Sequence, residues 1–214
     1  MDVSILTVFP EIYTNFLQTS LMKRAQEKDI VSFDVCAFSS FCKDKERIDS
    51  PTVGHGSGMA IRPDVIERAV DVQEKKYGKA YRIFLTPQGE KLDQRLTKKL
   101  AMSFVENDHV MLVAGRYEGI DERAHTEYVD IEVSIGDYIL MGGDLPAMVL
   151  LETVMRYIPS VVGKSESVEK DSFSGAFLDF PTYTAPPRVW KDREIPPILL
   201  DGHHAKIDEW RLNN

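Results

Sequence analysis

Short apolar segments alternate with amphipathic, helix-like segments through the first 158 residues of the chain, and this alternation most constrains the fold. Apolar, β-branched runs predict strands at residues 3–9, 31–38, 80–85, 109–114 and 131–135. Helical spacing of apolar residues predicts helices at residues 11–29, 64–77, 93–104, 122–127 and 146–157, with residues 39–59 as a polar loop. Strands that alternate with helices indicate an α/β fold with a mainly parallel sheet.

The pattern changes after residue 158. Residues 159–176 are rich in serine, glycine and charge and are expected to form a linker between an α/β domain at 1–158 and a small C-terminal segment at 177–214. That segment contains two proline pairs and ends in a helix predicted at 204–212. It is too short to bury a core of its own, so we expect it to pack on another surface, such as a second subunit.

Charge and cysteine content narrow the classes of function. The formal net charge is −8, so any binding to nucleic acid must depend on local basic contacts. Cys36 and Cys42 have no metal-ligand spacing, which fits a reducing cytoplasm. The longest apolar region, residues 138–158, is interrupted by charged side chains and does not indicate a membrane span. The candidate phosphate contacts are Lys43, Lys45, Arg47, Lys164, Lys170 and Arg188.

Glycine-bearing loops follow three of the predicted strands in the middle of the chain, at residues 86–89, 115–119 and 135–146. Ligands of open parallel sheets bind where loops leave the carboxyl ends of strands, and glycine there lets the backbone approach a ligand closely. One such loop is more simply read as a tight turn. Three of them, each after a strand, favour a single small-molecule pocket.

The familiar nucleotide fingerprints are absent from the sequence. The first strand runs into Thr7-Val8-Phe9-Pro10-Glu11 instead of G-x-G-x-x-G, and there is no G-x-x-x-x-G-K-[ST] motif. A glycine-rich stretch at residues 54–58 follows a polar loop and is weak evidence for a dinucleotide. The pocket therefore calls for another kind of ligand.

Several motifs carry a family resemblance across almost the whole chain. GRYEGIDER at 115–123 and SIGDYILMGGDLPA at 134–147 are long and independent, and TPQG at 86–89, KDSF at 170–173 and the opening at 3–11 occur in the same order. Together they resemble the bacterial tRNA (guanine(37)-N1)-methyltransferases, the TrmD family of the SPOUT class. The resemblance implies methyl transfer from S-adenosyl-L-methionine to N1 of the guanine 3′ of the anticodon.

The same resemblance implies features that no local pattern reveals. These are a deep trefoil knot in the α/β domain, which topology rules would disfavour, an obligate homodimer, and tRNA held across both subunits. Magnesium dependence is a family property, but no carboxylate cluster identifies a site, so no metal ligand is assigned. By position, the implied cofactor-binding residues are Thr86, Pro87, Gln88, Gly89, Gly115, Tyr117, Glu118, Ile135, Gly136, Asp137, Tyr138, Ile139, Leu140, Gly142, Gly143 and Pro146.

Asp171 and Arg156 are the residues that the resemblance implies for the chemical step. Guanine N1 carries a proton and becomes nucleophilic only when a base removes it, and the resulting charge on O6 needs a cation. Asp171 would be the base and Arg156 the cation. Without the resemblance, the residues themselves favour a linker charge or helix cap for Asp171, and a last-turn arginine that complements the helix dipole for Arg156.

Two departures from the family pattern leave alternatives open. His55 and Ser57 stand in the glycine-rich segment, and the chain stops at Asn214 where family members typically continue into further helices. A 2′-O-ribose methyltransferase of the same fold group would not need a base placed like Asp171. A catalytically silent RNA-binding dimer is a third hypothesis, which the acidic charge and the short end allow.

Overall fold

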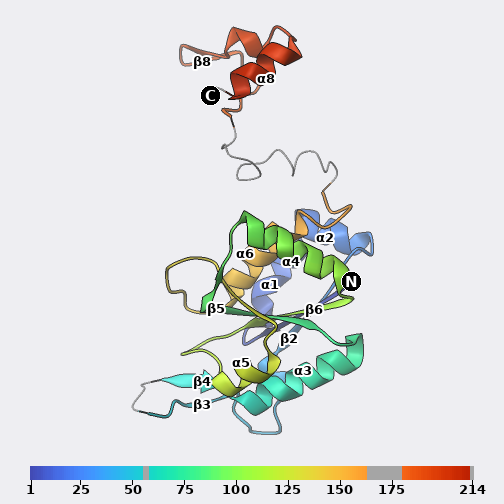
Figure 1. The fold of residues 1–214 in the computed structure, drawn as a ribbon, viewed down its shortest axis with the longest axis vertical. Coiled ribbons are helices and arrows are strands. Elements are labelled where there is room, and N and C mark those ends of the chain that lie inside the picture. Colours follow the sequence, from blue (N-terminus) through green and yellow to red (C-terminus); the bar gives the residue numbers. More distant parts are fainter. Residues whose placement is uncertain (55–57, 163–179, 213–214) are drawn as a thin grey trace. The chain divides into compact units, whose positions relative to one another are not determined.

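The computed structural model describes residues 1–54, 58–162 and 180–212, and the chain divides into two compact units, residues 1–165 and 166–214 (Figure 1). The first unit is built on five strands: β1 (Asp2–Thr7), β2 (Ser32–Ala37), β5 (Tyr81–Lys91), β6 (His109–Ala114) and β7 (Ile131–Ser134). Their order is β2-β1-β6-β5-β7, and every pairing is parallel. The predicted α/β fold with a mainly parallel sheet is confirmed.

Helices cover both faces of this sheet (Figure 1). One face packs against α1 (Tyr13–Leu17), α2 (Ser20–Glu27), α4 (Gln94–Glu106) and α6 (Asp144–Met155), and the other against α3 (Pro63–Tyr77) and α5 (Glu122–Tyr128). Successive strand residues point to opposite faces, so Ile5 joins the first core and Leu6 the second. Pro63 begins α3, one residue before the predicted start at 64, because proline is preorganised for the first helical position.

The prediction of a single helix at residues 11–29 is wrong. A 3₁₀ turn (η1, Pro10–Ile12) leads into α1, and Thr19 and Ser20 then separate α1 from α2, with Thr19 extended and Ser20 at φ 50°. Tyr13 and Met22 are both buried in the same core. At about 100° per residue a continuous helix would place them about 180° apart. The break lets both side chains face inward.

Two further segments differ from the expectation. The polar loop expected at residues 39–59 contains a 3₁₀ turn (η2, Phe38–Phe41) and the first strand of a small antiparallel hairpin, β3 (Asp49–Pro51) with β4 (Met59–Ile61). Residues 86–89, expected as a turn after a strand that ends at Leu85, belong to β5 instead, where the register against β7 shifts between Leu85 and Glu90.

The second unit contains a hairpin, each of whose two strands has two residues, and the predicted helix. Strands β8 (Val189–Trp190) and β9 (Arg193–Glu194) are joined by Lys191 and Asp192, both at positive φ, as a tight hairpin turn requires. A 3₁₀ turn (η3, Pro197–Leu199) precedes α8 (His204–Leu212), which has the predicted bounds. None of the helices in the described parts of the chain is long and apolar enough to cross a membrane.

Candidate active site

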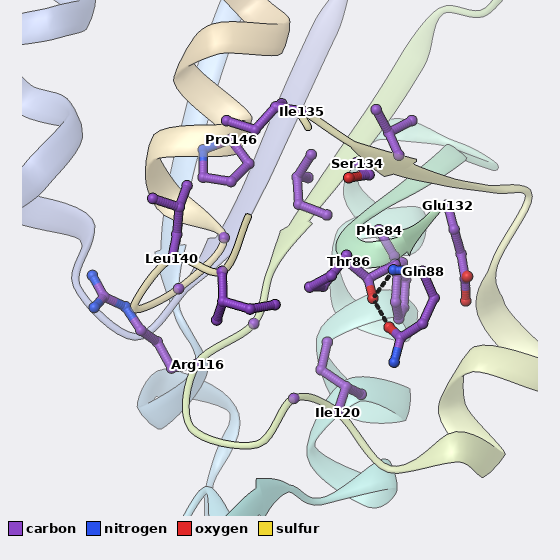
Figure 2. A pocket seen from close by; sticks show the side chains of 18 of the residues that line it. Phe84, Thr86, Gln88, Arg116, Ile120, Glu132, Ser134, Ile135, Leu140 and Pro146 are labelled. Atoms are coloured by element: carbon purple, nitrogen blue, oxygen red, sulfur yellow. Dashed lines mark hydrogen bonds between the residues drawn. The ribbon is translucent and has the colours of Figure 1, made fainter. Parts of the chain in front are cut away.

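A cavity of about 470 Å³ lies beside residues 84–88 of β5 and the carboxyl ends of β6 and β7, where the three glycine-bearing segments meet. Figure 2 shows its walls, with Thr86 and Gln88 on one side and Leu140 and Pro146 on the other. All sixteen residues predicted to bind the cofactor line this cavity except Gly89 and Asp137. The structure thus gathers into one place residues that lie as much as sixty positions apart, from Thr86 to Pro146.

Two of the glycine segments are joined directly through their backbones. The Gly143 N–H donates to the Gly115 carbonyl at 2.8 Å, and Arg116 and Gly142 form an isolated antiparallel bridge. A Cβ at Gly143 would lie 2.9 Å from the Ala114 Cα and 3.0 Å from the Gly115 nitrogen. Only glycine permits this approach, which sets the spacing of the cavity wall.

The loop at residues 115–119 is also held from the side of the small hairpin. The Glu118 N–H donates to the Met59 carbonyl at 2.9 Å, and a Cβ at Gly58, whose φ is +124°, would lie 2.6 Å from the Glu118 Cγ. The glycine-rich segment therefore ends against Glu118, which places this carboxylate in the cavity wall. His55 and Ser57, the two departures in that segment, lie outside the described residues.

Gly89 and Asp137 have other surroundings. Gly89 lies within β5, where a Cβ would be 2.4 Å from the Val133 nitrogen of β7, so glycine is required there for strand packing. Asp137 is mostly exposed and pairs with Lys91 at 2.6 Å. Both residues border the cavity segments without lining the cavity.

Three carboxylates line the cavity: Glu118, Glu122 and Glu132. His125, from α5, lies 2.6 Å from Glu132 of β7 through Nδ1 and Oε1. The His125 ring meets the edge of Phe84 at a centroid distance of 5.1 Å. Glu122, His125 and Glu132 were not predicted, because they come from α5 and β7 and no local sequence pattern indicates that they lie together. Acidic walls favour a cationic ligand.

The two residues predicted for the chemical step are not in this cavity within the described residues. Arg156 caps the carboxyl end of α6 and lines a second cavity, of about 410 Å³, with residues of α1 and α2. Pro146, near the start of α6, lines the first cavity. Ten residues of helix separate them, or about 15 Å at 1.5 Å per residue. Asp171 lies outside the described residues.

The candidate phosphate contacts remain candidates. Lys43, Lys45, Arg47 and Arg188 are exposed, and Arg47 pairs with Asp49 at 2.9 Å. Lys164 and Lys170 lie outside the described residues. Across the described ranges, no three or more His, Cys, Asp or Glu side chains gather to hold a metal ion.

An α/β fold with an acidic cavity lined by glycine-bearing segments of its sheet edge is typical of proteins that bind small molecules, and comparison with known proteins identifies the family. The family model described as tRNA (Guanine-1)-methyltransferase TrmD matches residues 1–214. The chain belongs to this family, as the sequence resemblance predicted.

Individual relatives agree with the family. The chain is 42% identical to the tRNA (guanine-N(1)-)-methyltransferase of Mycoplasmopsis synoviae, over 99% of this chain and 90% of the relative. It is 41% identical to that of Bacillus subtilis, over 99% and 86%. The crystal structure of tRNA (m1G37) methyltransferase from Aquifex aeolicus matches with a TM-score of 0.82 and 32% identity, over 99% of this chain and 88% of that one.

Proposed function

We propose that this protein transfers a methyl group from S-adenosyl-L-methionine to N1 of guanine 37 in tRNA, in the cytoplasm. The observation that carries the proposal is the convergence of three glycine-bearing segments on one acidic cavity, in a chain whose relatives are named for guanine-N1 methylation of tRNA. The fold class fits, because ligands of open parallel sheets bind at this edge.

The cavity residues suit the proposed methyl donor. S-adenosyl-L-methionine carries its transferable methyl group on a positively charged sulfur, so it is an electrophile and a cation. Glu118, Glu122 and Glu132 supply negative potential around it. The close approach at Gly143 leaves backbone groups of residues 115 and 142–143 free of side chains that would fill the space beside a flat base. We propose that the fourteen predicted residues lining the cavity hold this donor.

Two further residues, Asp171 and Arg156, are proposed to act on the guanine. Asp171 takes the N1 proton, and Arg156 stabilises the negative charge that develops on O6 as the proton leaves. The guanine must leave its stack to reach a protein pocket, which costs unstacking energy. Arg156 lies at the carboxyl end of α6, where its positive charge also interacts favourably with the helix dipole. Substitution of Arg156 therefore tests the catalytic role directly.

The exposed face of α6 supports the proposed homodimer. Leu145, Val149, Glu152 and Arg156 share this face, at spacings of four, three and four residues, and Leu145 and Val149 are 58% and 41% exposed. Ile139 and Met141, in the adjacent cavity loop, are 80% and 89% exposed. Exposed apolar side chains gathered around a ligand site mark an interaction surface. A second copy on this face would bury them together with Arg156.

Dimerisation also offers a way to complete the active site. Arg156 and the cofactor cavity lie at opposite ends of α6 in one chain. We propose that Arg156 of one subunit works beside the cavity of the other and that tRNA contacts both subunits. The deep trefoil knot that the family resemblance implies is proposed for the α/β domain, residues 1–158, which carries all three cavity segments.

One assay tests the function. The purified chain is incubated with methyl-labelled S-adenosyl-L-methionine and unmodified tRNA, and the product nucleoside is identified by mass spectrometry. We expect 1-methylguanosine at position 37. A methyl group on a ribose 2′-oxygen would instead establish the alternative activity, and unmodified tRNA that lacks guanine at position 37 is the control. Light scattering at micromolar concentration, with an expected dimer mass, tests the assembly separately.

A further inference from the structure

Asp144 holds a buried charge at the start of α6, directly behind the cavity. Its side chain is 2% exposed, and its Oδ2 receives the Arg116 guanidinium from Nε at 2.8 Å and from Nη2 at 2.7 Å. The other oxygen, Oδ1, accepts hydrogen bonds from the Thr7 hydroxyl at 2.5 Å and the Tyr13 hydroxyl at 3.2 Å. These four bonds satisfy the hydrogen-bonding capacity of one buried carboxylate.

Arg116 belongs to the cavity by its backbone and to this cluster by its side chain. Its guanidinium extends away from Thr86 and Gln88 (Figure 2) and lies 4.9 Å from the centre of the Phe9 ring. Its backbone forms the bridge to Gly142, and its carbonyl accepts from the Gly119 N–H at 3.1 Å. The side chain therefore fixes the two glycine segments from outside the cavity.

The loop at residues 116–119 contains a strained residue, so it needs a restraint of the kind that the Asp144–Arg116 ion pair can supply. Tyr117 has φ +61°, a conformation that costs a non-glycine residue free energy unless the surroundings impose it. Tyr117 is also half exposed, so side-chain burial does not supply the restraint. The adjacent ion pair restrains the loop, together with the hydrogen bond from the Glu118 N–H to the Met59 carbonyl, since a planar guanidinium that binds through two nitrogens has a fixed orientation.

We infer that Asp144 is a positioning residue, which through Arg116 holds residues 115–119 against 142–143 in the geometry that binds the methyl donor. The inference rests on the proposed function. It also explains the opening Thr7-Val8-Phe9 segment, whose conformation no cofactor contact required. Thr7 binds Asp144 and accepts the Phe9 N–H at 3.0 Å, and Phe9 covers Arg116. A buried ion pair is seldom retained for stability, because apolar residues of similar volume do as well.

Asp144→Asn tests the inference, since the amide keeps an acceptor for Thr7 and Tyr13 but removes the charge that binds Arg116. We expect S-adenosyl-L-methionine to bind roughly 10- to 100-fold more weakly by calorimetry, the range for losing a hydrogen bond to a charged group. Hydrogen exchange at the Gly119 and Gly143 amides should accelerate more than at the amides of β1. Unchanged affinity, or uniform acceleration across the sheet, would overturn the inference.

Tyr13→Phe is the matched control. It removes one hydrogen bond from the same carboxylate, and leaves the Arg116 ion pair intact. It should lower the melting temperature while changing cofactor affinity less than about twofold, which is within the spread of a neutral change. If both variants weaken binding equally, Asp144 acts through general stability and not through Arg116. If the wild-type chain binds no S-adenosyl-L-methionine, the proposed function fails, and the exchange pattern alone decides whether Asp144 positions the loops.

Discussion

Both ends of the central sheet contain a buried polar cluster, and β1 contributes a residue to each. At the amino end, the Ser4 hydroxyl lies 2.9 Å from Gln73 Oε1 and 2.8 Å from His109 Nε2, and His109 Nδ1 lies 2.9 Å from the Gly78 carbonyl. At the carboxyl end, Thr7 binds Asp144, which binds Arg116. The two clusters are similar in burial and in hydrogen bonding, but only the second adjoins the large acidic cavity.

The difference lies in what surrounds the polar groups. The amino-end cluster is enclosed by α3 and the starts of strands, and its hydrogen bonds satisfy one another. The carboxyl-end cluster supports residues 115–119 and 142–143, where glycines leave the cavity wall without side chains. Burial of a polar group therefore does not mark a functional site by itself, whereas a buried polar group that supports glycine-bearing loops does. The following predictions test this comparison in order of expected effect.

Asp171→Asn should have the largest effect, because it removes a proton acceptor and keeps the shape. A positioned general base contributes roughly 10²–10⁴-fold, so single-turnover methyl transfer should fall by about that factor. Cofactor affinity should hardly change. Raising the pH should partly restore the rate, since solvent can then accept the N1 proton. Arg156→Ala, measured alongside, should respond less to pH, and a fully active Asp171→Asn protein would leave Asp171 as a linker charge.

Gly143→Ala should weaken cofactor binding, whereas a matched substitution at the amino end of the sheet should not. The new Cβ would lie within 3.1 Å of the Ala114 and Gly115 backbone, so the cavity wall must shift and cofactor binding should weaken. Methyl transfer should fall by about 10²-fold, the usual cost of a misplacement near 1 Å. Gly78→Ala, at the amino end, is the matched control. Its Cβ meets open space, but φ is +88° and ψ is 176°, a region that is essentially restricted to glycine, so the variant should lose about 1–3 kcal/mol of stability and keep its affinity for the cofactor. Equal effects on affinity would erase the distinction between the ends.

The carboxyl-end loops could be predicted from the sequence because their signal is local. Gly115 directly follows β6 and Gly136 lies two residues after β7, and the rule for parallel sheets assigns their position. The side-chain contacts that support these loops could not be predicted. Arg116 and Asp144 are 28 residues apart, and Thr7 and Asp144 are 137 apart, with no periodicity to relate them. The break between α1 and α2 was missed for the same reason, since Tyr13 faces inward toward a partner far along the chain.

Ser4→Ala should affect stability and nothing else. The variant removes the hydroxyl that Gln73 and His109 share, leaving buried polar groups unsatisfied at a cost of about 1–3 kcal/mol. The free energy of unfolding, from urea denaturation, should fall by that amount. Methyl transfer and cofactor affinity, measured well below the transition, should match the wild type. A selective loss of activity would show that the amino-end cluster also communicates with the cavity.

The smallest effect is expected from Asp34, on the rim of the amino-end cluster. Burial would raise the pKa of its carboxyl, but hydrogen bonds from Lys76, Cys36 and Tyr77 outweigh it and hold the pKa below its ordinary value of 3.8. The native state therefore binds fewer protons than the unfolded state in this range. The stability contributed by the ionised form is fully present above pH 3.8 and is lost as the pH falls through the lower, folded pKa.

Asp34→Asn should consequently make unfolding less sensitive to acid, with a shallower loss of stability between about pH 4 and pH 2. At pH 7 the variant should be slightly less stable than the wild type, because Lys76 loses an ion pair that is partly exposed and weak. Thermal melts across this pH range measure both effects. Cofactor affinity at pH 7 should be unchanged, because Asp34 lies at the opposite end of the sheet from the cavity. If the acid profiles of the two proteins coincide, the hydrogen bonds to Asp34 do not favour its ionised form in the folded protein.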